Sequence, residues 1–219
     1  MPIDVTTPLP RIVPILLLVD TSGSMAADGK IDVLNDAVIR MIAVFKKMTM
    51  PGWEYSLSVI SFGGIAKVHL PPTVIETVVW SPLGAVGSTP MGDAFSLATQ
   101  LLNDETAIPM RSFKPQIILV SDGIPTDDYK EPLKELGESK HGKRSFRFAV
   151  GIGADARLEV LKEFAGKEGE VVPVERVELL TEFFKYVTLA VTKSVVRPVK
   201  SQTELPTFKD FSTSEIIEF

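Results

Sequence analysis

LLLVDTSGSM, residues 16–25, joins an apolar run to an aspartate and three hydroxyl side chains that surround one glycine. The run occupies residues 12–19 and reads as a strand buried on both faces, as in a parallel sheet covered by helices. Because ligands bind beyond the carboxyl ends of such strands, the turn at Asp20 lies where a functional site is expected. Four kinds of site would suit it: an acid protease, an aspartyl phosphotransferase, a phosphate-binding loop and a site for a hard metal ion.

The rest of the chain alternates apolar runs of strand length with longer segments of helical periodicity. Pro71 and Pro72 are expected to end the third strand. The alternation predicts an α/β fold, a single doubly wound, mostly parallel central sheet flanked by helices on both faces. The domain is expected to span residues 10–196, and residues 197–219 to form a polar C-terminal tail outside the core. The expected strands are 12–19, 55–62, 65–70, 116–123, 145–153 and 170–175, and the expected helices are 30–48, one starting near Met91, one through Leu158, Leu161 and Phe164, and 179–195.

The composition limits the ligands that the chain can hold. Among its 219 residues there is no cysteine, which excludes disulfides, thiolate nucleophiles, iron–sulfur clusters and cysteine-built zinc sites. Two histidines are too few for an imidazole-rich zinc site. A metal ion would therefore be held by oxygen, which points to Mg²⁺ or Mn²⁺, with Ca²⁺ fitting less well.

Charge and hydropathy limit the partners. The net charge of −5, without a block of like charges, argues against binding to nucleic acid or to a membrane surface. The first apolar run is far shorter than the roughly 20 residues that cross a bilayer. The first residues also lack the pattern of a signal peptide. We therefore expect a soluble, cytoplasmic protein.

Two catalytic uses of Asp20 fit poorly. In an acid protease the glycine follows the threonine directly, whereas here Ser22 separates Thr21 from Gly23, and that fold would be all-β. An aspartyl phosphotransferase usually has a second acid two residues after its nucleophile. This chain has Ser22 there, and a hydroxyl cannot do the acid–base work of a carboxyl group at neutral pH.

Phosphate-binding loops fit poorly as well. No glycine-rich loop is followed by Lys-Ser or Lys-Thr. GIGADA, residues 151–156, matches the dinucleotide-binding pattern G-x-G-x-x-A, and Glu175 follows at a spacing suited to ribose. Asp155 within that loop would repel a pyrophosphate, so we interpret the glycines as a tight turn.

A hard-metal site accounts for more of the sequence. Asp20, Ser22 and Ser24 occupy alternate positions, so in an extended turn their side-chain oxygens can face one point. Asp122 ends a second buried strand, and Thr89 precedes a helix. Five oxygen-bearing side chains from three loops would form an incomplete octahedron, and a cation would offset the repulsion between the two carboxylates.

These residues resemble the von Willebrand factor type A domains over roughly residues 10–195. That family carries D-x-S-x-S, then a threonine in a G-x-T-P loop, then Asp-Gly after a buried strand. Here the three motifs stand in order at residues 20–24, 87–90 and 122–123. The resemblance implies a metal-ion-dependent adhesion site, in which Ser22, Ser24 and Thr89 coordinate the ion through hydroxyls. Asp20 and Asp122 would act directly or through water, and a Glu or Asp of a protein partner would complete the shell.

Within that family, the absence of cysteine and the phrase SDGIPTDD, residues 121–128, resemble the bacterial tellurium-resistance group called TerY-like. Members of the group are linked to stress-response operons, and some carry a cysteine-based metal module, which this chain lacks. The prediction is a non-enzymatic module that binds Mg²⁺ or Mn²⁺ and captures an acidic residue of a protein partner. The alternative is a metal-dependent phosphoryl-transfer enzyme with Asp20 as nucleophile.

Two further hypotheses concern the rim of the site. Asp28 and one of Asp127 and Asp128 are candidates to line it. Glu215 and Glu218 place carboxylates on the C-terminal segment, which would dock in its own metal site or that of a neighbouring copy.

Overall fold

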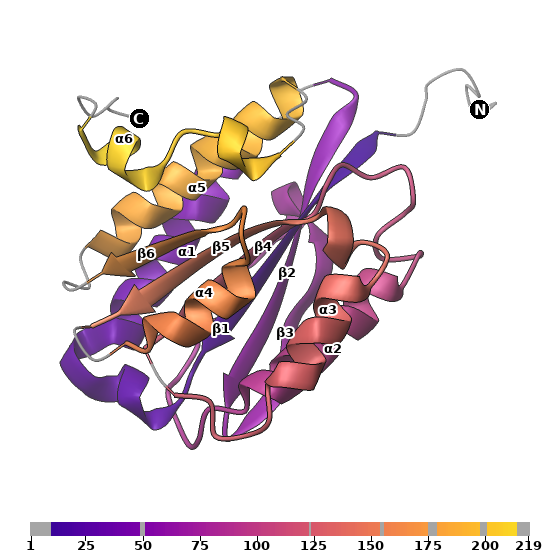
Figure 1. Cartoon of the computed structure of the whole chain (residues 1–219). Coiled ribbons are helices and arrows are strands. Elements are labelled where there is room, and N and C mark those ends of the chain that lie inside the picture. The colour runs from indigo at the N-terminus through magenta and orange to yellow at the C-terminus, as the bar shows by residue number, and fades with distance from the viewer. Residues whose placement is uncertain are drawn as a thin grey trace.

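The computed structural model describes residues 10–48, 51–122, 124–153, 156–174, 179–197 and 201–213. A six-stranded sheet in the order β3-β2-β1-β4-β5-β6 forms the centre of the molecule (Figure 1). The β2–β3 pair is antiparallel and the other pairs are parallel. The predicted α/β fold is therefore confirmed. The strands are β1 (Arg11–Asp20), β2 (Trp53–Gly63), β3 (Ile65–Val74), β4 (Gln116–Ser121), β5 (Phe146–Ile152) and β6 (Glu170–Val174).

Helices cover both faces of this sheet (Figure 1). Helices α1 and α5 pack together on one face, and α2, α3 and α4 cover the other. Helix α3 is not among the helices expected from the sequence. The helices are α1 (Lys30–Lys47), α2 (Met91–Asn103), α3 (Lys130–Glu138), α4 (Leu158–Ala165), α5 (Leu179–Val196) and α6 (Phe208–Thr213), with short 3₁₀ turns η1 (Gly23–Gly29), η2 (Ile75–Thr77), η3 (Gly142–Arg144) and η4 (Gln202–Glu204). Within the described ranges, no helix is long and apolar enough to span a membrane.

Strand β1 shows why the opening run is apolar throughout. Leu17 and Val19 point into the core under α1 and α5, whereas Leu16 and Leu18 point into the core under α2 and α4. Both faces of a central parallel strand are buried, so neither set of alternating positions tolerates polar side chains. The strand turns polar only at Asp20, where the sheet ends.

The strand order reverses between β1 and β4, which lie side by side in parallel. From β1 the chain winds outward to β2 and β3, and from β4 it winds the other way to β5 and β6. The two acid-ended strands are therefore neighbours, with Asp20 and Asp122 at the same edge of the sheet. This is the point at which open α/β sheets bind their ligands.

Strand β3 is longer than the sequence suggested, because Pro71 and Pro72 do not end it. They lie between two paired positions, Leu57↔Thr73 and Val59↔Leu70, where the register shifts. β3 carries one more residue than β2 across this interval, which is a bulge. A bulge on an edge strand has no ladder bond to lose to a proline, so the prediction that the prolines end the strand is wrong.

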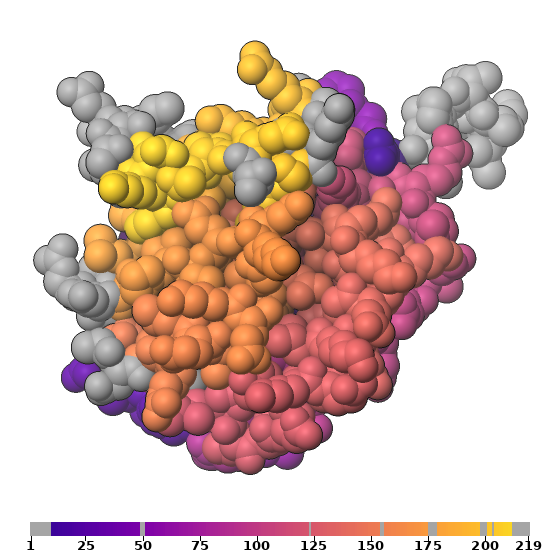
Figure 2. Space-filling view, viewed as in Figure 1, coloured from indigo at the N-terminus to yellow at the C-terminus, as the bar shows by residue number. Residues whose placement is uncertain are grey.

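The expectation of a tail outside the core is corrected for residues 201–213. Leu205 is buried in the core under α5, and Phe208 and Phe211 pack against Tyr186 of that helix. Figure 2 shows this segment, in yellow, lying against the rest of the molecule. Three apolar side chains spaced three apart anchor the segment although its composition is polar. Glu215 and Glu218 lie outside the described residues.

Candidate metal centre

Asp20 is fully buried at the end of β1, and both of its carboxylate oxygens accept hydrogen bonds. Oδ1 accepts from the backbone N–H of Ser22 at 2.8 Å, and Oδ2 accepts from Ser121 Oγ at 2.5 Å. Burial raises the pKa of Asp20. The hydrogen bonds from Ser121 and Ser22 oppose that shift, and the charge of Asp122 adds to it. The site therefore holds a desolvated carboxylate that a nearby cation would stabilise.

A chain of oxygens leads from this turn to the neighbouring strand. Ser22 Oγ and Ser24 Oγ lie 3.0 Å apart and share a hydrogen bond. Ser24 Oγ in turn donates to Asp122 Oδ1 at 2.7 Å. Ser22 is buried and Ser24 is exposed, so the chain runs from the interior to the surface. An ion held along it would be reachable from solvent.

The second oxygen of Asp122 holds a cation of the protein itself. Lys30 Nζ donates to Asp122 Oδ2 at 2.5 Å, and the two side chains are 16% and 2% exposed. Sequence patterns did not identify Lys30. The available signal was its position in the first turn of a helix, where the macrodipole disfavours a positive charge and a specific partner is therefore expected.

Backbone contacts fix the turn after β1 against the loop before α2. Val86 N–H donates to Thr21 O at 2.7 Å, and Gly23 N–H donates to Gly87 O at 2.9 Å. Gly63, the last residue of β2, lets that strand approach the same turn closely, because a Cβ there would lie 2.1 Å from Thr21 O. The loop that carries Thr89 is thereby held beside the serines.

Thr89 itself is buried, but its contacts are different from those of the other four predicted residues. Its backbone N–H donates to Thr126 Oγ1 at 3.1 Å, and its carbonyl accepts from Thr126 N–H at 3.0 Å. In the part of the chain that the structure describes, no hydrogen bond joins the Thr89 hydroxyl to Asp20, Ser22, Ser24 or Asp122. The structure thus connects four of the five residues and places the loop of the fifth beside them.

Asp127 has a structural role rather than a place on the rim. Its carboxylate accepts from the backbone N–H groups of Gly92 and Asp93, each at 3.0 Å, and so caps the start of α2. Together with the Thr89–Thr126 pair, this cap ties the loop after β4 to the loop before α2. Asp28 and Asp128 are exposed.

The donors present fit a divalent ion of the magnesium type. In an octahedral shell with metal–oxygen distances of about 2.1 Å, neighbouring ligand oxygens lie about 3.0 Å apart. The Ser22–Ser24 and Ser24–Asp122 separations of 3.0 and 2.7 Å are hydrogen-bond lengths that lie near this spacing, so these oxygens are compatible with such a shell. Over the described ranges, no group of three or more histidine and acidic side chains comes together. The hydroxyls would therefore supply the donors that two carboxylates leave missing.

Comparison with known proteins identifies the family of the chain. A sequence profile of the von Willebrand factor type A domain matches residues 15–124, about half of the chain. The chain belongs to the von Willebrand factor type A family. The matched part includes all five predicted site residues. No curated protein sequence matches the chain.

Solved structures show the same fold at low sequence identity. A von Willebrand factor type A protein from Catenulispora acidiphila is 17% identical, with a TM-score of 0.63, over 83% of this chain and 42% of its own. Proximal thread matrix protein 1 from the mussel byssus, with a zinc-occupied MIDAS motif, is 17% identical, with a TM-score of 0.65, over 84% of this chain and 48% of its own. BatB from Bacteroides thetaiotaomicron, a conserved hypothetical protein, is 18% identical, with a TM-score of 0.60, over 84% and 99%. The chain spans less than half the length of the first two structures.

Proposed function

We propose that this domain binds a divalent metal ion, Mg²⁺ or Mn²⁺, and uses it to capture an acidic side chain of a protein partner. The observation that carries the proposal is the cluster of Asp20, Ser22, Ser24 and Asp122 at the edge of the sheet, in which Asp122 already holds the ammonium group of Lys30. A cluster that binds one cation in this way has the charge and the donor atoms to bind another.

The two carboxylates determine what a bound ion would do. Ser22, Ser24 and Thr89 would hold the ion through hydroxyls, with Asp20 and Asp122 as the anionic groups. Two carboxylates balance the charge of a divalent ion. Because the five donors form an incomplete octahedron, the bound ion would still act as a Lewis acid toward one further oxygen ligand. Ser24 lies on the exposed side of the cluster, which leaves an approach for the carboxylate of a partner.

The surroundings of Asp20 support a binding role over catalysis. A nucleophilic carboxylate needs an oxygen that can reach the substrate. Asp20 is fully buried, and both oxygens are engaged by Ser22 and Ser121. Phosphoryl transfer with Asp20 as nucleophile would require this arrangement to open, so we propose that the domain is not an enzyme.

The choice of metal and the biological setting are parts of the same proposal. The mussel protein, which shares the fold, holds zinc at its MIDAS motif and supports divalent-ion binding in general. The all-oxygen donors of this chain favour Mg²⁺ or Mn²⁺. We propose a role in a bacterial stress or tellurium-resistance system, in the cytoplasm, and the support for that role is the resemblance carried by the motif SDGIPTDD and the absence of cysteine.

Calorimetric titration of Mg²⁺ and Mn²⁺ into chelator-treated protein tests the metal site. We expect saturable binding that both Asp20→Ala and Ser22→Ala abolish, whereas Asp128→Ala, a change at an exposed acid, leaves it intact. A folded wild-type protein that binds neither ion would overturn the proposal.

The acidic partner is tested with a small probe. N-acetylglutamate methylamide should bind to the Mn²⁺-loaded protein, and the paramagnetic ion should then shorten the proton relaxation times of the compound. The relaxation times of the glutamine analogue should stay unchanged. Equal effects of the two compounds would contradict capture of a carboxylate.

A further inference from the structure

From the contact between Lys30 and Asp122 we infer that Lys30 is a built-in competitor of the divalent ion, so that the metal enters only when the lysine leaves. This inference rests on the proposed metal site and concerns how that site is regulated. Lys30 Nζ lies 2.5 Å from Asp122 Oδ2, while Asp122 Oδ1 accepts from Ser24. Both oxygens of the carboxylate that would face the ion are thus already engaged.

The charges at the site make the two cations alternatives. Asp20, Asp122 and Lys30 sum to −1, and replacing the lysine by a divalent ion brings the sum to zero. Holding both would leave +1 in a site whose carboxylates are at most 7% exposed, and two cations a few ångströms apart repel strongly where water is scarce. Exchange of one cation for the other avoids both an unpaired carboxylate and that repulsion.

The backbone before α1 is built to aim this lysine at the site. Asp28 and Gly29, the last two residues of the 3₁₀ turn η1, adopt left-handed conformations, with φ of 53° and 67°, directly before the helix. Asp adopts a left-handed φ more readily than most residues with a side chain, and Gly29 adopts it without a steric cost, so these two residue types favour the kink. It turns the chain so that Lys30, the first residue of α1, reaches Asp122 at the end of another strand.

Gly153 lies across the site, close to the side chain of Lys30. Gly153 follows β5 with φ of 92°, and a Cβ there would lie 3.5 Å from Lys30 Nζ. The amine therefore lies close to the ends of both β4 and β5. Such a position is specific, and it differs from that of the exposed Lys134, which pairs with Glu131 on the surface of α3.

The experiment compares metal affinity in the wild type, Lys30→Met and Lys134→Met, with Mg²⁺ as titrant after chelator treatment. Methionine keeps the apolar stem and removes the charge. If the lysine occupies Asp122 nine-tenths of the time, its removal strengthens apparent binding about tenfold, because a ligand's apparent affinity scales with the competent fraction. Lys134→Met changes the net charge equally and should leave affinity within about twofold.

The outcomes separate this inference from the proposed function. Tighter binding by Lys30→Met than by both the wild type and Lys134→Met supports competition. Equal affinity in the wild type and Lys30→Met overturns the inference and leaves the metal site standing. Absence of binding in both proteins overturns the metal site and the inference with it.

A second measurement uses the wild type only, in case Lys30→Met does not fold. Reductive methylation followed by mass spectrometry reports how accessible each lysine is. Mg²⁺ should increase the methylation of Lys30 severalfold and leave that of Lys134 unchanged. Unchanged methylation of Lys30 at a Mg²⁺ concentration that saturates the site would contradict displacement.

Discussion

Lys30 and Arg147 are both partly buried cations, and they stand at opposite ends of the sheet. Lys30 reaches the carboxyl edge and meets a carboxylate, Asp122. Arg147 is the second residue of β5, at the amino edge, and its guanidinium donates to two backbone carbonyls, at 3.1 Å to Phe164 and 3.5 Å to Gly142. Among the described residues it has no carboxylate partner.

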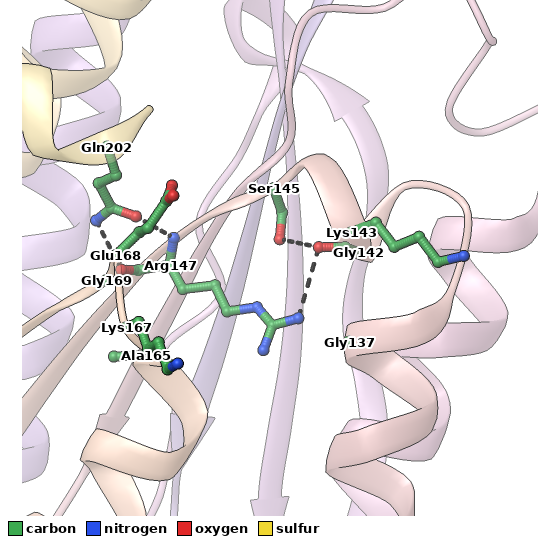
Figure 3. A pocket seen from close by; sticks show the side chains of 11 residues that line it. Gly137, Gly142, Lys143, Ser145, Arg147, Ala165, Lys167, Glu168, Gly169 and Gln202 are labelled. Carbon is green, nitrogen blue, oxygen red and sulfur yellow. Dashed lines mark hydrogen bonds between the residues drawn. The ribbon is translucent and has the colours of Figure 1, made fainter. Parts of the chain in front are cut away.

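The surroundings of Arg147 are those of a structural bridge. It lies in a pocket of about 230 Å³, and burial lowers its pKa. Figure 3 shows Lys143 pointing away from the guanidinium, so these two cations do not converge on one point. Gln202 lines one side of the pocket, where its side-chain amide pairs with both the N–H and the carbonyl of Arg147, at 2.8 and 2.7 Å. Arg147 therefore joins α4, η3 and η4 to β5.

The difference shows what each kind of partner allows. A carboxylate retains its charge when the cation leaves, so another cation can replace Lys30. The carbonyls around Arg147 are neutral, so they attract a replacement cation much more weakly than a carboxylate does. The same charge thus makes an exchangeable contact at one edge and a fixed one at the other.

The largest expected effect is at the carboxyl edge. Asp122→Asn removes the charge on which both cations depend, and we expect Mg²⁺ affinity to fall about 100-fold or more. Calorimetric titration measures this change. An affinity within about threefold of the wild type would show that Asp122 does not face the ion.

Arg147→Met should lower the stability of the protein without changing its affinity for Mg²⁺. Loss of two charged hydrogen bonds to carbonyls is expected to lower the free energy of unfolding by about 2–3 kcal/mol. Urea unfolding with and without Mg²⁺ should show the same loss in both conditions, with Mg²⁺ affinity unchanged. A change in metal affinity would mean that the two edges of the sheet are coupled rather than independent.

Gln202→Ala tests the C-terminal side of the same pocket. The substitution removes two hydrogen bonds to the backbone of Arg147, and only water can take their place. We therefore expect the free energy of unfolding to fall by about 1–2 kcal/mol. Hydrogen exchange at the Arg147 amide should also accelerate. Unaltered exchange would indicate that residues 201–213 contribute little to the amino edge.

The smallest effect concerns His141, which is buried beside this pocket. Burial lowers its pKa, with the charges of Arg144 and Lys140 acting in the same direction and Glu105 against them. The unfolded chain then binds a proton more readily, so this contribution to stability is complete above about pH 6.5 and is lost below it, by at most about 1.4 kcal/mol per pH unit. The wild-type stability relative to His141→Gln, from urea unfolding at pH 5.5 and 7.5, should fall at the lower pH. A difference independent of pH would contradict a neutral buried imidazole.

Much of the carboxyl edge could be predicted from sequence, because it depends on local patterns. Buried parallel strands are apolar throughout, so the points at which they turn polar mark the sheet edge. That rule alone predicts that Asp20 and Asp122 lie at one edge of the sheet. It does not extend to Thr89, because the position of that residue depends on how the loop before α2 is tied to Thr126.

Other features depend on contacts between residues far apart in the chain. Lys30 directly follows the left-handed kink at Asp28 and Gly29, and its partner Asp122 lies at the end of another strand. Pro71 and Pro72 are tolerated because β3 is an edge strand with a bulge. The packing of Leu205 is hidden by the polar composition around it. In each case the deciding partner lies in another element, which periodicity within one segment does not reveal.

The most direct test of the metal site and of its exchange with Lys30 is a crystal structure of the Mn²⁺-soaked protein with anomalous diffraction. We expect one strong anomalous peak among Ser22 Oγ, Ser24 Oγ and Asp122, with Lys30 Nζ no longer in contact with Asp122. A folded protein with no peak there would contradict the metal site, and a peak beside an intact Lys30–Asp122 pair would contradict the exchange of one cation for the other.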